Sequence, residues 1–442
     1  MKIITRFAPS PTGKLHIGNA RIALLNFLYA QKHNGQFILR IDNTDKERSK
    51  KEFEDLIKKD LNWLGLNWDI EFDQNSRVAR YDIVKEHLIK TGELYPCYET
   101  QEELEIKRKS LLSRNLPPIY DRSALKLSSD AISSYSDQGK KPHYRYKIKN
   151  TPIKWNDMIK DEVRYESQYL SDPVLVREDG TMTYMLCSTI DDIDYNISHV
   201  IRGEDHITNT AIQIQLFESL LATPPIFGHL GLIKTKDSKI SKREGGFEIE
   251  SLREQECFEA LSINNFLSCI GSSKNTTIHI NLQSIINEFD IKAFSKNSTI
   301  YETKDIEIIN EKIIANLSYK DVVDSLTKII GSEISENFWI SVRANLKKLK
   351  DAKVWWDICY NFQINNNQDL EYLNLAKTLF PQEELDENSW KNWTESIKNV
   401  TKRSGKSLYL PLRLAITGIE SGPELALLLP LIGKEEILRR LS

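Results

Sequence analysis

Two short polar motifs, far apart in the chain, contain the residues that could do chemistry. The first runs from Ala8 to Asn19 as APSPTGKLHIGN, and the second runs from Lys239 to Arg243 as KISKR. The first is typical of a strand-to-helix turn that offers an imidazole, His16, to a nucleotide. The second is typical of a loop that brings two ammonium groups to a triphosphate. Together they predict an enzyme that attacks the α-phosphate of ATP.

The first motif favours phosphate binding because a helix is expected to begin directly after it. Such a helix presents free backbone N–H groups and the positive end of its dipole. Gly13 and Gly18 let the backbone approach a ligand where a Cβ would intrude, and His16 can donate to a phosphate oxygen as charge develops. A lone HxGx would more often be a strand-to-helix turn with an incidental histidine. The complete string from Ala8 to Asn19 instead favours a turn that binds a nucleotide. We expect catalysis by His16 and ATP contacts from Ser10, Thr12, His16, Gly18 and Asn19.

The second motif places Lys239 and Lys242 on either side of Ser241, in a loop that ends at Gly245 and Gly246. Two lysines on a glycine-bounded loop can close over a pyrophosphate leaving group as point charges. Taken alone, such a run is more often a solvated surface patch. Its pairing with the first motif favours a role in binding the triphosphate. We predict that Lys239 and Lys242 are catalytic and that Ser241 and Lys242 contact ATP.

Composition narrows the class of protein. A chain of 442 residues, 40% apolar and 28% charged, is expected to be soluble and to divide into about two to four domains. The net charge of −3 neither requires nor excludes nucleic-acid binding. The five scattered cysteines contain no CxxC, which argues against a disulfide framework. No leader precedes the first strand and no apolar run is long enough to span a membrane, so a cytoplasmic protein is expected.

The motifs lie within a recognisable order of elements. Alternating residues predict a strand over 2–8, helical spacing predicts a helix over 20–33, and a second strand follows over 37–41. A helix with a capping-box sequence beginning at Ser49 then runs to a stop at Gly65. This alternation predicts a doubly wound parallel sheet of the α/β class.

The alternation of strand and helix is interrupted once. From about 96 to 178, prolines, a serine-rich stretch and short alternating runs indicate an inserted α+β domain. A strand over 196–201 and a helix over 208–221 restore the pattern. After the lysine loop the chain is expected to be mostly helical.

Both motifs resemble those of a known family. Residues 8–19 resemble the HIGH signature of class I aminoacyl-tRNA synthetases, and residues 239–243 resemble their KMSKS loop. More narrowly, several segments resemble the bacterial glutamyl-tRNA synthetases: 5–13, 39–45, 200–205, 411–418 and 431–435. The resemblance extends over nearly the whole chain.

The resemblance implies an architecture of four parts. These are a Rossmann-type catalytic domain over 1–95 and 179–230, an inserted α+β acceptor-end-binding domain over 96–178, a KMSKS loop and stem-contact region over 231–310, and an all-α anticodon-binding region over 311–442. Five tryptophans of the C-terminal half are expected in the core rather than against bases: Trp339, Trp355, Trp356, Trp390 and Trp393.

The resemblance also implies a glutamate pocket. Guanidinium forks match a side-chain carboxylate bidentately, and Arg6 and Arg202 match the arginines of the family's pocket. Asp42 matches the acidic position for the α-ammonium group, which is often Glu in the family. The pocket residues carried over are Arg6, Ser10, Asp42, Tyr184, Ser188 and Arg202. Taken singly, Arg6 could point outward from its strand and Arg202 could pair with a neighbouring carboxylate.

The expected activity is that of a glutamate–tRNA ligase. ATP, with Mg²⁺, activates L-glutamate to glutamyl-adenylate, and the glutamyl group passes to the 3′-terminal adenosine of tRNA(Glu). Family members require bound tRNA for efficient activation. Zinc, found in the inserted domain of some members, is not expected because Cys97 has no second ligand at suitable spacing. The chain is expected to be a monomer.

The choice of tRNA stays open at this point. In some members an arginine in the anticodon-binding helices separates glutamate from glutamine tRNAs, and Asn345 stands at the matching position, close to Arg343. The chain could therefore charge tRNA(Glu), tRNA(Gln) or both. Three other functions are alternatives: a small-molecule nucleotidyltransferase, a tRNA-modifying relative that lacks the anticodon-binding part, and a non-catalytic RNA-binding paralogue.

Overall fold

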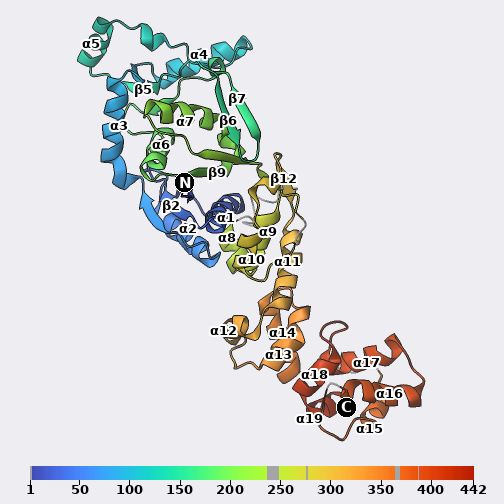
Figure 1. Ribbon diagram of the computed structural model, residues 1–442. Coiled ribbons are helices and arrows are strands. Elements are labelled where there is room, and N and C mark those ends of the chain that lie inside the picture. Colours follow the sequence, from blue (N-terminus) through green and yellow to red (C-terminus); the bar gives the residue numbers. More distant parts are fainter. Residues whose placement is uncertain (1, 236–247, 275–276, 364–368, 387) are drawn as a thin grey trace. The chain divides into compact units, whose positions relative to one another are not determined.

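The computed structural model describes residues 2–235, 248–274, 277–363, 369–386 and 388–442 (Figure 1). The chain forms two compact units. The first comprises Met1–Leu252, Asn264–Thr277 and Asn281–Glu302, and the second comprises Arg253–Ile263, Ile278–Ile280 and Thr303–Ser442. The division into four parts stays a prediction. No described helix combines the length and the apolar character needed to cross a membrane.

A parallel sheet forms the centre of the first unit. Strands β1 (Ile4–Phe7), β2 (Gln36–Ile41) and β3 (Ile70–Asp73) pair in that order, and β9 (His199–Gly203) pairs in parallel with β10 (Ile226–Leu230). Ser198 joins the two groups, since its N–H donates to the Ile4 carbonyl at 2.9 Å and its hydroxyl accepts from the Ile4 N–H at 2.7 Å. The expected parallel α/β architecture is confirmed. In such sheets, ligands bind beyond the carboxyl ends of the strands at the topological switch point, where the strand order reverses. Here these strands are β1 and β9.

Helices connect these strands: α1 (Ile17–Lys32), α2 (Lys51–Trp63), α3 (Val78–Lys90), α6 (Tyr184–Asp194) and α7 (Ile207–Ser219). The capping box predicted at Ser49 is wrong. The N-cap of α2 is Lys50, which makes no side-chain capping bond. Tertiary contacts explain the shift, because the Lys50 N–H donates to the Pro11 carbonyl at 3.0 Å and so ties this segment to the first motif.

The stretch predicted as an insertion has α+β structure. Strands β4 (Leu94–Cys97), β5 (His143–Tyr146) and β8 (Val174–Val176) form an antiparallel sheet, and β6 (Ile153–Asp157) and β7 (Asp161–Tyr165) form a hairpin. Helices α4 (Gln101–Ser113) and α5 (Ser129–Asp137) accompany them. The tip of the hairpin contacts the parallel sheet, where the Met158 N–H donates to the Phe227 carbonyl at 2.8 Å.

A short parallel pair, β11 (Ile233–Thr235) and β12 (Thr299–Tyr301), also belongs to the first unit, together with α10 (Leu282–Glu288). Helices α8 (Ile249–Glu254) and α9 (Ala260–Cys269) lie between them in sequence. The expectation of a mostly helical chain after the lysine loop is confirmed, with β12 as an exception among the described residues.

The second unit contains α11 (Thr303–Asn316), α12 (Tyr319–Ile330), α13 (Glu336–Val342), α14 (Ala352–Tyr360), α15 (Leu370–Thr378), α16 (Ser389–Thr401), α17 (Lys406–Thr417), α18 (Leu425–Ile432) and α19 (Lys434–Arg440). They pack around one apolar core. Trp339 and Trp393 are buried there, and their indole N–H groups donate to the Leu317 carbonyl at 3.0 Å and the Ala376 carbonyl at 2.8 Å. Trp355 is buried too, and Trp356 and Trp390 pack against this core, which confirms the expected role of the five tryptophans.

Candidate active site

A cavity of about 530 Å³ opens at the carboxyl ends of β1 and β9. Its walls come from the turn after β1, the first turns of α1, and the residues that follow β2, β9 and β10. Nine of the predicted site residues line it: Arg6, Ser10, Thr12, His16, Gly18, Asn19, Asp42, Tyr184 and Arg202. Segments almost 200 residues apart in the chain therefore meet at one hollow.

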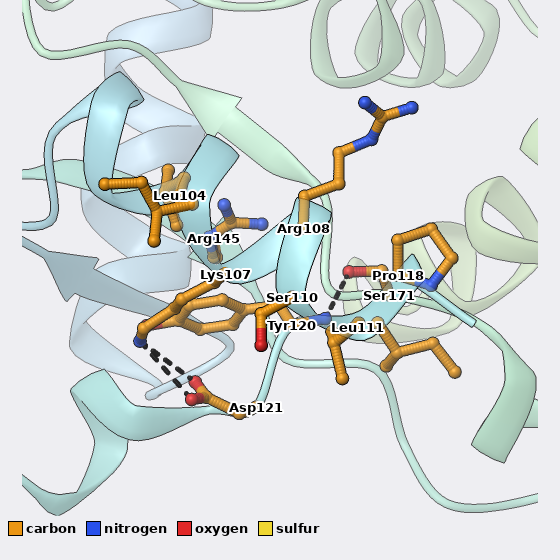
Figure 2. A pocket seen from close by; sticks show the side chains of 12 residues that line it. Leu104, Lys107, Arg108, Ser110, Leu111, Pro118, Tyr120, Asp121, Arg145 and Ser171 are labelled. Carbon is orange, nitrogen blue, oxygen red and sulfur yellow. Dashed lines mark hydrogen bonds and ion pairs between the residues drawn. The ribbon is translucent and has the colours of Figure 1, made fainter. Parts of the chain in front are cut away.

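A second hollow, of about 520 Å³, lies in the α+β stretch beside α4 (Figure 2). None of the predicted site residues lines it. Its charged groups have partners: the Lys107 ammonium lies 3.3 Å from an Asp121 carboxylate oxygen, and the Arg145 guanidinium lies 4.2 Å from the centre of the Tyr120 ring. The cavity at the sheet is therefore the candidate active site.

Lys239, Ser241 and Lys242 lie outside the described residues, and their roles stay predictions. The described residues on both sides of this segment lie at the cavity. Ile233 lines the wall before the segment. After it, Glu248 forms an antiparallel bridge with His16, and the Ile249 N–H donates to the Leu15 carbonyl at 2.9 Å.

His16 is the N-cap residue of α1. Its Nδ1 accepts from the Gly18 N–H at 3.2 Å, so the ring proton of the neutral form lies on Nε2. Burial lowers the pKa of His16, and the nearby Glu248 carboxylate opposes this effect. At neutral pH the side chain is thus an uncharged hydrogen-bond donor beside the positive end of a helix dipole.

Arg202 is a buried guanidinium, 4% exposed, whose partners are neutral. It donates to the Tyr184 hydroxyl at 3.2 Å, the Thr210 hydroxyl at 2.6 Å and the side-chain amide oxygen of Gln213 at 2.7 Å. No carboxylate of the described chain forms an ion pair with it, and burial lowers its pKa. A buried charge without a counter-ion is costly, so this position favours an anionic ligand.

Arg6 and Asp42 are compensated to different degrees. The Arg6 Nε lies 3.4 Å from an Asp192 oxygen that also receives Arg40 Nη1 at 2.8 Å, so Arg6 shares this partner. Asp42 is held by the Arg40 fork, with N–O distances of 2.6 and 3.3 Å. Burial nevertheless raises the pKa of Asp42 to about 6. A ligand ammonium at Asp42 would have to share the carboxylate with Arg40.

Comparisons with known proteins decide the family. Residues 2–308 match the family "tRNA synthetases class I (E and Q), catalytic domain", and residues 359–442 match the family "Anticodon binding domain". The chain is 56% identical over 444 aligned residues to glutamate–tRNA ligase 1 of Rickettsia bellii, covering all of both chains. It is 55% identical to glutamate–tRNA ligase 1 of Rickettsia felis, covering 100% of this chain and 99% of the relative. The chain belongs to the class I glutamate–tRNA ligases.

Solved structures agree with this assignment. The crystal structure of a glutamate tRNA ligase from Elizabethkingia meningosepticum in complex with its amino acid superposes with a TM-score of 0.87 at 25% identity, over 100% of this chain and 98% of that chain. A glutamate–tRNA synthetase from Elizabethkingia anophelis superposes with a TM-score of 0.86. The nucleotidyltransferase and the tRNA-modifying alternatives are wrong, because the ligase is similar to these relatives over its whole length.

Ser188 is the described pocket residue of the ligase that does not line the cavity. It lies one helical turn after Tyr184 on α6, where the helix is already buried. Its hydroxyl accepts from Gln213 Nε2 at 3.0 Å, and Gln213 in turn accepts from Arg202. The structure places Ser188 behind the arginine, and its expected ligand contact stays a prediction.

Several site residues were missed by the sequence prediction. Arg40 locks Asp42, and Arg21 lines the cavity while donating to the Gly231 carbonyl at 3.0 Å and the Ile270 carbonyl at 2.9 Å. Thr210 and Gln213 are buried polar partners of Arg202 on α7. The available signal was a polar residue within an otherwise apolar strand or helix face.

Proposed function

We propose that this ligase activates L-glutamate with ATP and transfers it to the 3′-terminal adenosine of tRNA(Glu). The observation that supports this most is the cavity at β1 and β9, where a buried Arg202 with neutral partners lies in the same hollow as His16 and the N-terminus of α1. An acidic side chain and a nucleotide are the two ligands that this combination favours.

In the proposed pose, the side-chain carboxylate of glutamate lies between Arg202 and Arg6. Tyr184 and Ser10 complete this end of the pocket, and the α-ammonium faces Asp42. This orientation leaves the α-carboxylate pointing toward the first motif. Glutamine would leave the Arg202 charge without a counter-ion, which disfavours it.

In the first step, an α-carboxylate oxygen attacks the α-phosphorus of ATP. The bond from that phosphorus to the bridging oxygen breaks, and pyrophosphate leaves with the electron pair. The His16 Nε2–H and the α1 amides stabilise the developing charge, with Lys239 and Lys242 as the expected partners of the leaving group. Mg²⁺ enters with ATP, since it prefers phosphate and water oxygens.

In the second step, the 2′-hydroxyl of the terminal adenosine attacks the glutamyl carbonyl. The ester forms, the acyl–phosphate bond breaks, and AMP leaves, its phosphate taking up the hydroxyl proton. Neither step requires an enzyme nucleophile, so positioning and charge stabilisation supply the catalysis.

Exchange of labelled pyrophosphate into ATP tests the proposal, with glutamate or glutamine and with or without each tRNA. We expect tRNA-dependent exchange with glutamate. Arg202→Lys keeps the charge but cannot make the three contacts of the fork, so we expect the KM for glutamate to rise roughly tenfold to a hundredfold while the KM for ATP stays constant. Exchange with glutamine alone, or none at all, would refute the proposal; the second outcome would favour the non-catalytic paralogue.

Selection between tRNA(Glu) and tRNA(Gln) needs a separate experiment. Asn345 is exposed, while the nearby Arg343 guanidinium donates to the Leu317 carbonyl at 3.0 Å and is engaged within the second unit. We propose that the ligase, as a cytosolic monomer, charges tRNA(Glu) and also accepts tRNA(Gln). Charging assays with purified isoacceptors test this, and strict rejection of tRNA(Gln) would refute the dual use.

A further inference from the structure

A buried carboxylate at the end of β6 lies next to a buried histidine of β10. The Asp157 and His229 side chains are both fully buried, with Oδ2 and Nδ1 2.5 Å apart. The other Asp157 oxygen accepts from three backbone N–H groups, those of Ile159, Lys160 and His229, each at 3.0 Å. The hairpin turn therefore fixes the carboxylate, and the carboxylate fixes the imidazole.

The contact with Asp157 determines which atoms donate and which accept in the hydrogen bonds from His229 through Thr210 to Arg202. A carboxylate only accepts, so His229 carries a proton on Nδ1. Its Nε2 faces the Arg202 Nε–H donor, and burial lowers the pKa of His229, so the ring is neutral and Nε2 accepts. The Thr210 hydroxyl lies 2.8 Å from this Nε2 and donates to it. Its oxygen then accepts from Arg202 Nη2 at 2.6 Å. Arg202 Nε lies 3.4 Å from the same imidazole nitrogen.

We propose that Asp157, His229 and Thr210 form a positioning chain that holds the Arg202 fork in the orientation that recognises the acidic side chain of the substrate. This inference rests on the proposed role of Arg202 in binding glutamate. A carboxylate in direct contact with Arg202 would compete with the substrate for its charge. Two neutral groups between Asp157 and Arg202 fix the guanidinium without neutralising it.

The chain also connects the hairpin to the substrate pocket. Besides the Met158–Phe227 hydrogen bond, a Cβ added at Gly228 would lie 3.3 Å from the Met158 Cβ, so the tip packs closely on β10. Asp157 belongs to the stretch predicted to hold the acceptor end of tRNA. The hairpin thus contributes to glutamate recognition without touching the ligand.

A matched pair at Thr210 tests the middle of the chain. Thr210→Val has nearly the same shape but removes the hydroxyl, which leaves buried donors and acceptors unpaired. We expect the KM for glutamate in tRNA-dependent exchange to rise about tenfold or more, with the KM for ATP unchanged. Thr210→Ser keeps the hydroxyl and is expected to stay within about threefold of the wild type. Equal glutamate KM values for both variants would overturn the proposal.

Asp157→Asn tests the origin of the chain. The amide oxygen can still accept the turn N–H groups, but the amide N–H₂ faces the Nδ1–H of His229. The imidazole must then place its proton on Nε2, which puts two donors, Nε2–H and Arg202 Nε–H, opposite each other. We expect a raised glutamate KM and weaker rejection of glutamine. Trp155→Phe is the control, since it removes the other donor to Oδ2, at 3.3 Å, and keeps an aromatic ring next to Tyr165 and His229.

Failure of a variant to fold leaves a test on the wild-type enzyme. Nitrogen-15 spectra of labelled histidine are expected to show His229 as the neutral Nδ1–H tautomer at neutral pH. A protonated ring or the Nε2–H tautomer would overturn the proposed chain. If Arg202→Lys raises the glutamate KM while Thr210→Val and Asp157→Asn do not, the inference fails and the proposed function stands; if wild-type enzyme shows no glutamate-dependent exchange, the proposed function itself fails.

Discussion

The buried arginines Arg202, Arg6 and Arg40 differ in their partners, and this difference supports different roles for them. Arg202 has neutral partners, Arg6 shares one carboxylate, and Arg40 contacts both Asp42 and Asp192 closely. Of these three, Arg202 is the one that contacts no carboxylate of the described residues, and in the proposed pose a substrate carboxylate supplies its counter-ion. At the residue scale, we therefore expect specificity for an acidic side chain to depend on the arginine whose partners are neutral.

His16→Asn separates the role of His16 as the N-cap of α1 from its proposed role as a donor to phosphate. Asn is a good N-cap and can still accept from the helix amides, but it lacks the Nε2–H that would reach a phosphate. We expect kcat to fall about a hundredfold to a thousandfold, with the free energy of unfolding unchanged within roughly 0.5 kcal/mol. Steady-state kinetics and chemical denaturation check both. An unchanged kcat would exclude His16 from catalysis.

The raised pKa of Asp42 predicts a pH dependence. In the proposed pose the α-ammonium of glutamate binds the charged Asp42 carboxylate, so the KM for glutamate should rise as the pH falls from 7 through about 6. The sign for stability is the reverse: the folded pKa exceeds the unfolded value, so the neutral form is favoured in the fold and stability declines as the pH rises from about 4 to 6. The KM for glutamate, measured at saturating ATP as the pH falls from 7 through about 6, checks the first effect. Asp42→Asn should abolish that pH dependence, and its persistence would point to another group.

At the scale of elements, β11 leads from the cavity to the segment that contains the predicted lysines. Gly231 precedes it, and an added Cβ would lie 2.1 Å from the Asn297 carbonyl oxygen. Gly231→Ala must therefore displace the backbone next to the β11–β12 pair, and we expect a loss of about 1–3 kcal/mol in the free energy of unfolding. Denaturant unfolding measures it. Gly13→Ala, with no atom within 4 Å of the added Cβ, is the control for stability; equal losses in both variants would contradict the prediction.

At the scale of the whole molecule, the two units have separate apolar cores. Trp339→Leu removes buried volume and the hydrogen bond to Leu317 from the second unit. We expect it to lower the free energy of unfolding of this unit by about 2–4 kcal/mol. Calorimetry should resolve two unfolding transitions. The variant is expected to lower the midpoint temperature of one, and glutamate with ATP to raise that of the other. A single transition shifted by both changes would show that the units unfold together.

The sequence predicted most of the elements and nine cavity residues, because strands and helices follow local periodicity and the two motifs are contiguous. Its local rules failed at Ser49, where a contact with Pro11 moved the start of α2. Ser188 was carried over as a ligand contact but lies behind Arg202. Spacing along a helix gives the face of a residue, whereas its depth depends on what packs against that face.

By itself, therefore, the sequence determined the type of chemistry: an imidazole at a helix N-terminus, a lysine-rich segment and two arginines for an acidic substrate. The tertiary structure alone decided the ionic partners of those groups. Arg6 and Arg40 reach Asp192, and Asp157 reaches Arg202 through His229 and Thr210, across large separations in sequence. Hydrogen bonds and charges act over a few ångströms of space, and only the folded chain fixes which groups come that close.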